Sequence, residues 1–132
     1  MMSMARQSVF ASTAPKPIGP YSQAATAPGL GVLFLSGQTP IDVATGELVD
    51  GDAEEQTRRV FHNLEQVLAE AGLGWDDVVK VNVYLTSMAD FEAMNSVYRD
   101  IFNEPFPART TVGVAELPLN ARVEIELTAA LR

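Results

Sequence analysis

The chain has 132 residues, of which 47% are hydrophobic, and it contains no cysteine. This length and composition suit one compact domain over residues 1–132, with enough apolar side chains for a core. A formal net charge of −8 disfavours nucleic acid and anionic lipid as partners, and the lack of thiols excludes disulfides, thiolate nucleophiles and thiolate metal sites.

The chain shows no sign of export or membrane insertion. Its start, MMSMARQSVFAS, lacks the long apolar core of a signal peptide. No apolar run elsewhere approaches the length needed to span a membrane. The sequence therefore predicts a cytoplasmic protein.

The N-terminal part is predicted to be extended. Residues 9–38 include the turn-rich stretch APKPIGPYS, which no helix tolerates, and then the apolar run GVLFLSG between Gly31 and Gly37. A continuous apolar run of this length favours a strand buried on both faces. The following stretch, PIDVATGELVDG, predicts a loop or a short hairpin.

The clearest predicted element is an amphipathic helix between Asp52 and Gly72. Apolar residues recur at helical spacing along DAEEQTRRVFHNLEQVLAEAG. Asp52 can cap the N-terminus, Glu55 is placed for a capping box, and Gly72 can end the helix. His62 is the only histidine and falls on the face opposite the apolar stripe, so we expect it in solvent and not as a metal ligand.

The second half of the chain is predicted as a strand, a helix and two more strands. In DVVKVNVYLTS, Val79, Val81, Val83 and Leu85 alternate with polar residues, as in a strand with one core face. A second helix is expected from about Asp90, its predicted N-cap, through FEAMNSVYRDIF. The last strands are predicted in RTTVGVAEL and ARVEIELTAAL, joined by the loop PLN.

This order of elements predicts an α+β domain, built from a mixed β-sheet with two helices on one face. The other face of the sheet would then be uncovered. A monomer rarely exposes a whole sheet face, so we expect other subunits to bury it.

Arg109 and Glu124 are the charged candidates for a functional site. In FPARTTVGV, prolines precede Arg109, and Thr111 and Gly113 share its side of the strand. The guanidinium is then either a fork for a carboxylate or a strand-end charge paired with a surface acid. Glu124 is expected on the polar face of the neighbouring strand, either solvated beside Glu126 or partly buried as a base for water activation.

Three uncharged polar residues are further candidates. Asn95 lies within the apolar stripe of the second helix, where a buried amide is either a structural bridge to backbone or a ligand contact. Tyr21 follows a rigid Gly-Pro turn, and Ser36 ends the predicted buried strand in LSGQ; packing and a plain turn are their alternatives. No histidine is placed for a Ser-His-Asp triad, and no nucleotide-binding motif is present.

Over nearly its whole length, the chain resembles the Rid family of reactive-intermediate deaminases, also called the YjgF-like or endoribonuclease L-PSP family. The resemblance rests on separated motifs in the same order and spacing: IGPYSQA, LFLSGQTPID, TGEL, QTRRVFHNLEQVLAEAGLGWDDVVKVNVYL, DFEAMNSVYRDIF and FPARTTVGVAELPLNARVEIE. It implies a chorismate-mutase-like fold and a homotrimer whose sheets face inward, with clefts between the subunits.

The resemblance also implies an activity, the hydrolysis of 2-aminoacrylate and related enamine or imine acids to 2-keto acids and ammonia. This reaction serves metabolite damage control and uses no cofactor and no metal. By position, Arg109 matches the arginine that grips the substrate carboxylate. Glu124 matches the acid placed to work with the attacking water.

Tyr21, Ser36 and Asn95 match positions that line the cleft in this family. Thr111 departs from the pattern, because many deaminating members have cysteine two residues after the arginine. A threonine changes the shape and softness of that wall and so bears on substrate preference. Two alternatives remain at this point, a trimeric module that binds small carboxylates without turnover, and a ribonuclease, which the charge of −8 disfavours.

Overall fold

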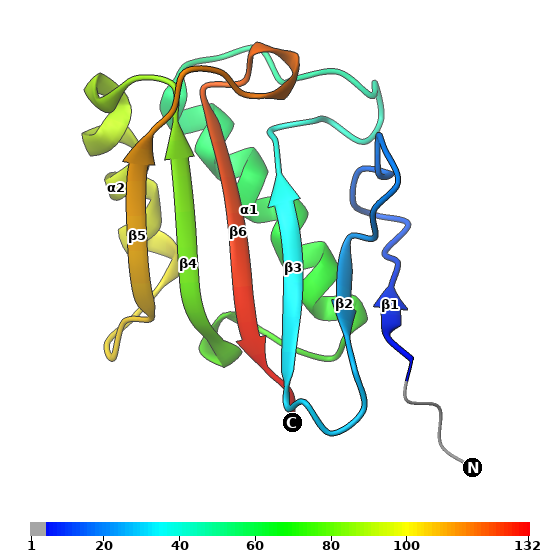
Figure 1. Cartoon of the computed structure of the whole chain (residues 1–132). Helices are drawn as coiled ribbons and strands as arrows, with labels where there is room; N and C mark the ends of the chain where they lie inside the picture. The colour runs from blue at the N-terminus through cyan, green and yellow to red at the C-terminus, as the bar shows by residue number, and fades with distance from the viewer. Residues whose placement is uncertain (1–4) are drawn as a thin grey trace.

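The computed structural model describes residues 5–132, which form one six-stranded sheet and two α-helices (Figure 1). Residues 1–4 lie outside the described part. They belong both to the predicted domain and to the N-terminal stretch MMSMARQSVFAS. In chain order the elements are β1 Gln7–Val9, β2 Ala24–Thr26, β3 Val32–Gln38, α1 Ala53–Glu70, β4 Val78–Leu85, α2 Phe91–Ile101, β5 Ala108–Gly113 and β6 Val123–Ala130, with short 3₁₀ helices at Trp75–Asp77, Met88–Asp90 and Pro118–Asn120.

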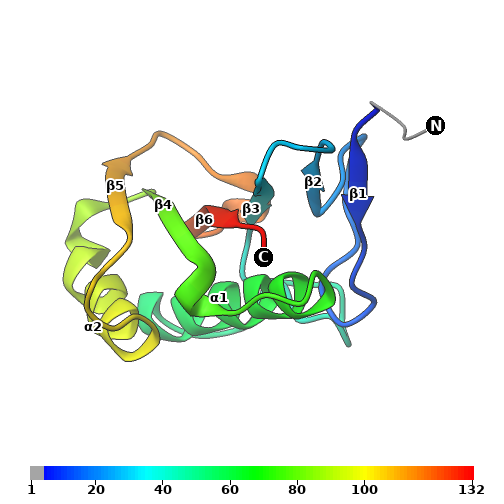
Figure 2. The same cartoon turned by 90° about the horizontal axis from the view of Figure 1, so that it is seen from below.

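The sheet has the strand order β1-β2-β3-β6-β4-β5. Its neighbouring strands are antiparallel except β4 and β5, which are parallel because α2 carries the chain back between them. Figure 2 shows both helices on the same side of the sheet. The predicted α+β class and mixed sheet are thus confirmed. No helix within residues 5–132 is long and apolar enough to cross a membrane.

The core lies between the sheet and α1. Phe61, Leu64 and Leu68 come from one stripe of α1 and are fully buried, as are Val83 of β4 and Ile125 of β6. This is the face that the helical spacing predicted. Burial of such side chains is the dominant favourable contribution to folding.

The ends of α1 follow their predicted chemistry. The backbone N–H of Glu55 donates to Asp52 Oδ1 at 2.9 Å, which satisfies one of the N-terminal donors that a helix leaves unpaired. Gly72 has a φ of 75° just beyond the helix, a conformation that glycine adopts at low cost. His62 is exposed, as expected.

Two burial predictions are wrong. Phe34 in β3 is 51% exposed, because helices cover only one face of the sheet and the strand is not buried on both. Val79 is 48% exposed while Val78 is buried. The register between β4 and β6 shifts between Val78 and Lys80, and such a bulge reverses the alternation at that point.

Local detail also differs before and after the first helix. The N-terminal part holds β1 and β2 in addition to β3, and the next stretch forms only an isolated bridge between Ile41 and Leu48. Asp90 precedes α2 but makes no side-chain cap there. Its carboxylate instead accepts two hydrogen bonds from Arg122, at 3.1 Å from Nε and 2.7 Å from Nη2.

A buried glutamine fixes the N-terminal segment to the sheet. Gln23 is 2% exposed. Its Oε1 accepts from the N–H of Ala11 at 2.7 Å, and its Nε2 donates to the carbonyls of Ala11 at 3.2 Å and Pro15 at 2.8 Å. This side chain therefore helps to tie the segment that leads to Tyr21 to the sheet.

We expect Gln23→Leu to lower the free energy of unfolding by about 2–4 kcal/mol, because it leaves buried backbone groups without partners. The measurement is urea unfolding at one fixed protein concentration. Gln7→Leu, at an exposed position of β1, is the matched control and should change stability little. Equal effects of the two substitutions would contradict this role for Gln23.

Candidate active site

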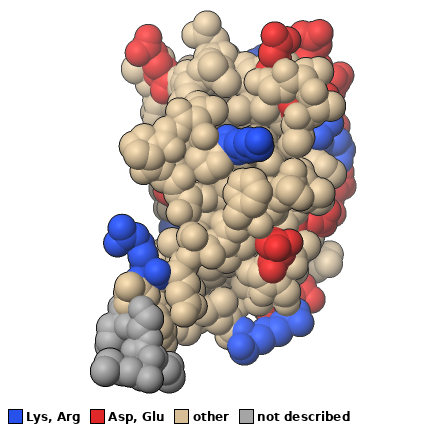
Figure 3. All heavy atoms as spheres, turned by 90° about the vertical axis from the view of Figure 1, so that its right-hand side faces the viewer, with Lys and Arg blue, Asp and Glu red and all other residues tan. Residues whose placement is uncertain are grey.

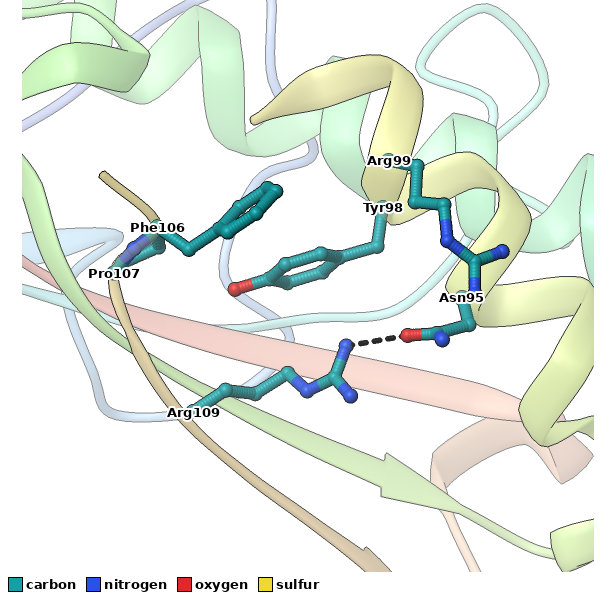
Figure 4. Close-up of a pocket in the computed structure, with 6 residues that line it drawn as sticks. All are labelled: Asn95, Tyr98, Arg99, Phe106, Pro107 and Arg109. Atoms are coloured by element: carbon teal, nitrogen blue, oxygen red, sulfur yellow. Dashed lines mark hydrogen bonds between the residues drawn. The ribbon is translucent and has the colours of Figure 1, made fainter. Parts of the chain in front are cut away.

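Arg109 of β5 points toward α2. It is opposite Val81 in the parallel pairing with β4, and Val81 is fully buried on the helix-covered face. Its Nη1 donates to Asn95 Oδ1 at 2.6 Å. Its Cζ lies 4.6 Å from the ring centroid of Tyr98 and 5.6 Å from that of Phe91. Figure 4 shows Arg109 with Asn95 and Tyr98.

These contacts bear on the predicted pairing of Arg109 with a surface acid. Within residues 5–132 the guanidinium forms no ion pair with a carboxylate, so a surface ion pair is not the structural role of Arg109. The Asn95 side chain also has a partner that was not predicted for it. Its amide oxygen accepts a hydrogen bond from Arg109 and does not bridge to backbone. Most of the N–H donors of the guanidinium remain for a further acceptor.

A cavity of about 280 Å³ lies beside this arginine, between α2 and the start of β5. Its walls are formed by Asn95, Tyr98, Arg99, Phe106, Pro107 and Arg109. On the same side of the sheet, the Thr111 Oγ1 is buried and has no hydrogen-bond partner among the described residues. An unpartnered buried hydroxyl requires an explanation, and a bound molecule would provide one.

Glu124 of β6 lies on the opposite, open face of the sheet, opposite Tyr84. Burial raises the pKa of the Glu124 carboxyl, and the negative charge of Glu126 raises it further. No hydrogen bond from residues 5–132 reaches its carboxylate. A half-buried carboxylate without donors is more basic than a solvated one.

Glu126 has the opposite environment, which separates the two acids that the sequence pattern left equivalent. It accepts hydrogen bonds from Asn82 Nδ2 at 3.1 Å and from the hydroxyl of Tyr84. The bond to Glu126 is the main cause that raises the pKa of Tyr84 to about 12, followed by burial. Glu126 is therefore held by two donors, whereas no donor in residues 5–132 holds the carboxylate of Glu124.

A β-bulge makes room for the Glu124 carboxylate. The register of β3 with β6 shifts between Leu35 and Gln38. A Cβ atom added at Gly37 would lie only 2.7 Å from Glu124 Oε2 and 2.9 Å from its Cδ, closer than side chains tolerate. Bulges of this kind often re-aim a side chain next to a functional site.

A second cavity, of about 550 Å³, opens on this face beside the bulge. Tyr21, Ser36 and Glu126 are among its walls. The Tyr21 hydroxyl accepts from the N–H of Ile18 at 3.3 Å, and Ser36 Oγ donates to the carbonyl of Ser22 at 2.6 Å. Arg6 also lines this cavity, and sequence reasoning missed it because only the pairing of β1 with β2 places it there.

The structure does not bring all the predicted site residues together in one protomer. Glu124 was expected on the strand next to that of Arg109, and this is wrong because β4 lies between β5 and β6. Arg109, Asn95 and Thr111 lie on the helix-covered side of the sheet. Glu124 lies on the open face, whose bulge and second cavity involve Tyr21 and Ser36.

The basic side chains on the side of the molecule nearest β1 do not gather into a patch (Figure 3). Figure 3 shows the side of the molecule nearest β1, where Lys and Arg side chains stand apart from one another. In residues 5–132, no group of three or more His, Asp or Glu side chains is arranged to hold a metal ion.

Comparison with known proteins gives consistent matches. The family described as Endoribonuclease L-PSP matches residues 11–131. A RutC family protein of Pyrococcus abyssi is 49% identical over 126 residues, 96% of this chain and 98% of its own length. The 2-iminobutanoate/2-iminopropanoate deaminase of Dermatophagoides farinae is 49% identical over 113 residues, 86% of this chain and 87% of its own. A protein of the conserved Rid family from Yersinia pestis superposes with a TM-score of 0.91 at 43% identity, over 96% of this chain and 100% of that one.

We expect Gly37→Ala to push the Glu124 carboxylate out of its half-buried position. The pKa of Glu124 should lie above the ordinary value of 4.5 in the unaltered protein and should fall back toward it in Gly37→Ala. NMR titration of the side-chain carboxyl carbon measures both. Gly74→Ala is the matched control, because an added Cβ meets nothing within 4 Å there. An unchanged pKa in Gly37→Ala would contradict the assignment of the bulge.

Proposed function

The chain belongs to the endoribonuclease L-PSP family, also called the Rid family, and on that premise we propose that it hydrolyses 2-aminoacrylate-type enamine and imine acids to 2-keto acids and ammonia. The observation that carries the proposal is Arg109, a guanidinium fixed by an amide and an aromatic ring and without an acidic partner in residues 5–132. Such a fork suits a carboxylate. A relative of 49% identity bears the name of a 2-iminobutanoate/2-iminopropanoate deaminase.

The proposed reaction begins with the imine tautomer of the substrate. Arg109 holds its carboxylate and so fixes the imine carbon relative to the attacking water. Glu124 takes a proton from that water as the oxygen bonds to the imine carbon, which gives a carbinolamine. Return of that proton to the nitrogen completes the neutral carbinolamine. Transfer of the hydroxyl proton to the nitrogen then lets the C–N bond break as the C=O bond forms, and ammonia and the 2-keto acid leave.

The raised pKa of Glu124 suits this role. A carboxylate with an ordinary pKa is a weak base, and a base works best when its pKa approaches the working pH. Burial and the nearby Glu126 both raise the pKa of Glu124. The protein supplies positioning and proton transfer, so the mechanism needs no nucleophile from the chain.

We further propose that the complete site forms between chains of a homotrimer, with the sheets facing inward. Arg109 and Glu124 lie on opposite faces of the sheet within one protomer, so a second chain is needed to bring such groups to one ligand. The open face also carries Phe34, which is 51% exposed, and Val112, which is 40% exposed. Apolar side chains on an uncovered sheet face favour association.

Light scattering should therefore give a mass of three 14.2-kDa chains at micromolar concentration. Phe34→Asp should shift this mass toward one chain while circular dichroism stays unchanged, because it puts a charge into the proposed interface. Val43→Asp, at a comparably exposed position in the loop after β3, is the control and should leave the mass unchanged. A monomeric unaltered protein would exclude the intersubunit site.

The activity is tested with 2-aminoacrylate generated by a coupled enzyme. We expect Glu124→Gln to lower kcat by about two to four orders of magnitude, the usual contribution of a positioned general base. Its affinity for pyruvate, measured by calorimetry, should stay within several-fold of the unaltered protein. Arg109→Lys should lose both turnover and pyruvate binding, since an ammonium lacks the planar fork. Glu92→Gln, at an exposed site of α2, should behave as the unaltered protein.

One result would remove the enzymatic assignment. If the unaltered protein speeds imine hydrolysis no more than water does, while pyruvate still binds and Arg109→Lys abolishes that binding, the protein is a small-carboxylate-binding module of the same family.

A further inference from the structure

The face of the Arg109 guanidinium is covered by the ring of Tyr98, a residue of α2. The separation of 4.6 Å between Cζ and the ring centroid is well within the range of an attractive cation–π contact. Phe91 lies farther away, at 5.6 Å. Asn95 meets one edge of the same guanidinium at 2.6 Å. The plane and the rotation of the fork are therefore fixed by two different neighbours.

We propose that Tyr98 is a positioning residue for carboxylate recognition, because its ring fixes the plane in which Arg109 presents its N–H donors. This inference rests on the proposed function, since it concerns the same arginine. An arginine side chain that is already ordered loses less conformational freedom when it binds its ligand. The ring thus contributes to affinity by ordering the arginine.

The ring of Tyr98 is itself held by the core. It is 5% exposed, it packs against Phe102 with centroids 4.7 Å apart, and it meets Phe61 edge-on at 6.1 Å. Phe61 is fully buried under the sheet. Packed aromatic rings therefore connect the core of the domain to the guanidinium. A flexible aliphatic side chain at position 98 would interrupt this connection.

The hydroxyl of Tyr98 does not account for this role. Its oxygen is buried without a hydrogen-bond partner in the described residues, and in Figure 4 it points toward Phe106 and Pro107, away from the guanidinium. Burial raises the pKa of Tyr98, while the charge of Arg109 opposes that shift. The group is thus an uncharged hydroxyl, and the ring face carries the interaction.

The experiment compares Tyr98→Leu with Tyr98→Phe. Leucine removes the ring, so Kd for pyruvate and KM for 2-aminoacrylate should both rise about five- to thirty-fold, as expected for a partly desolvated cation–π contact, while kcat changes less. Phenylalanine keeps the ring and should remain within two-fold. Leu33→Ala leaves a cavity in the core at β3, which β6 and β4 separate from β5. It should lower Tm without changing Kd beyond two-fold.

A spectroscopic readout tests the contact without any ligand. The Nε–Hε signal of Arg109, identified by its loss in Arg109→Lys, should be shifted upfield by the ring current. The shift should persist in Tyr98→Phe and disappear in Tyr98→Leu. If Tyr98→Leu does not fold, Tyr98→pentafluorophenylalanine keeps the shape of the ring but removes its negative face. This variant should weaken pyruvate binding about five-fold relative to Tyr98→Phe.

The outcomes separate this inference from the proposed function. If turnover is absent but pyruvate binding and the Arg109 signal depend on the ring, the inference stands and the enzymatic proposal falls. If turnover is present while removal or fluorination of the ring changes neither Kd nor the signal, the inference is overturned. Equal losses in Tyr98→Phe and Tyr98→Leu would assign the effect to the hydroxyl and would also overturn it.

Discussion

The insertion of β6 between β3 and β4 is the constraint on which the rest of the molecule depends. One set of its side chains, including Val123 and Ile125, is buried against the helices, while the alternate set, including Glu124 and Glu126, lies on the open face. The same strand therefore completes the core and carries the two acids. Because a strand alternates strictly, neither function can shift along β6 without disturbing the other.

This placement also gives the two acids different chemistry. Glu126 faces Asn82 and Tyr84 of β4 and uses both as donors. Glu124 faces the bulge of β3, where Gly37 contributes no side chain and no donor. Burial raises the pKa of Glu124, and the negative charge of the hydrogen-bonded Glu126 raises it further.

Much of the fold could be predicted from the sequence, because strong local periodicity defines α1 and β6 and needs no knowledge of distant partners. The prediction failed where distant pairing decides the outcome. The exposure of Val79 follows from a bulge against β6, and the distance between Arg109 and Glu124 follows from strand order. The candidate residues could be selected by residue type and sequence context. The contact of Asn95 with Arg109 could not be predicted, because no local sequence pattern gives the relative orientation of α2 and β5.

The central position of β6 has a consequence for biosynthesis. β6 follows the other five strands along the chain, so the strand that joins the two halves of the sheet is the last of the six to be synthesised. Until then, β3 and β4 each present an unpaired edge, and the apolar stripe of α1 lacks the core side chains of β6. Such contacts between distant segments form slowly and leave edges open to aggregation. The core of this domain therefore cannot close before β6 has been synthesised, and the pairing of β6 with β3 and β4 is the step that completes the sheet.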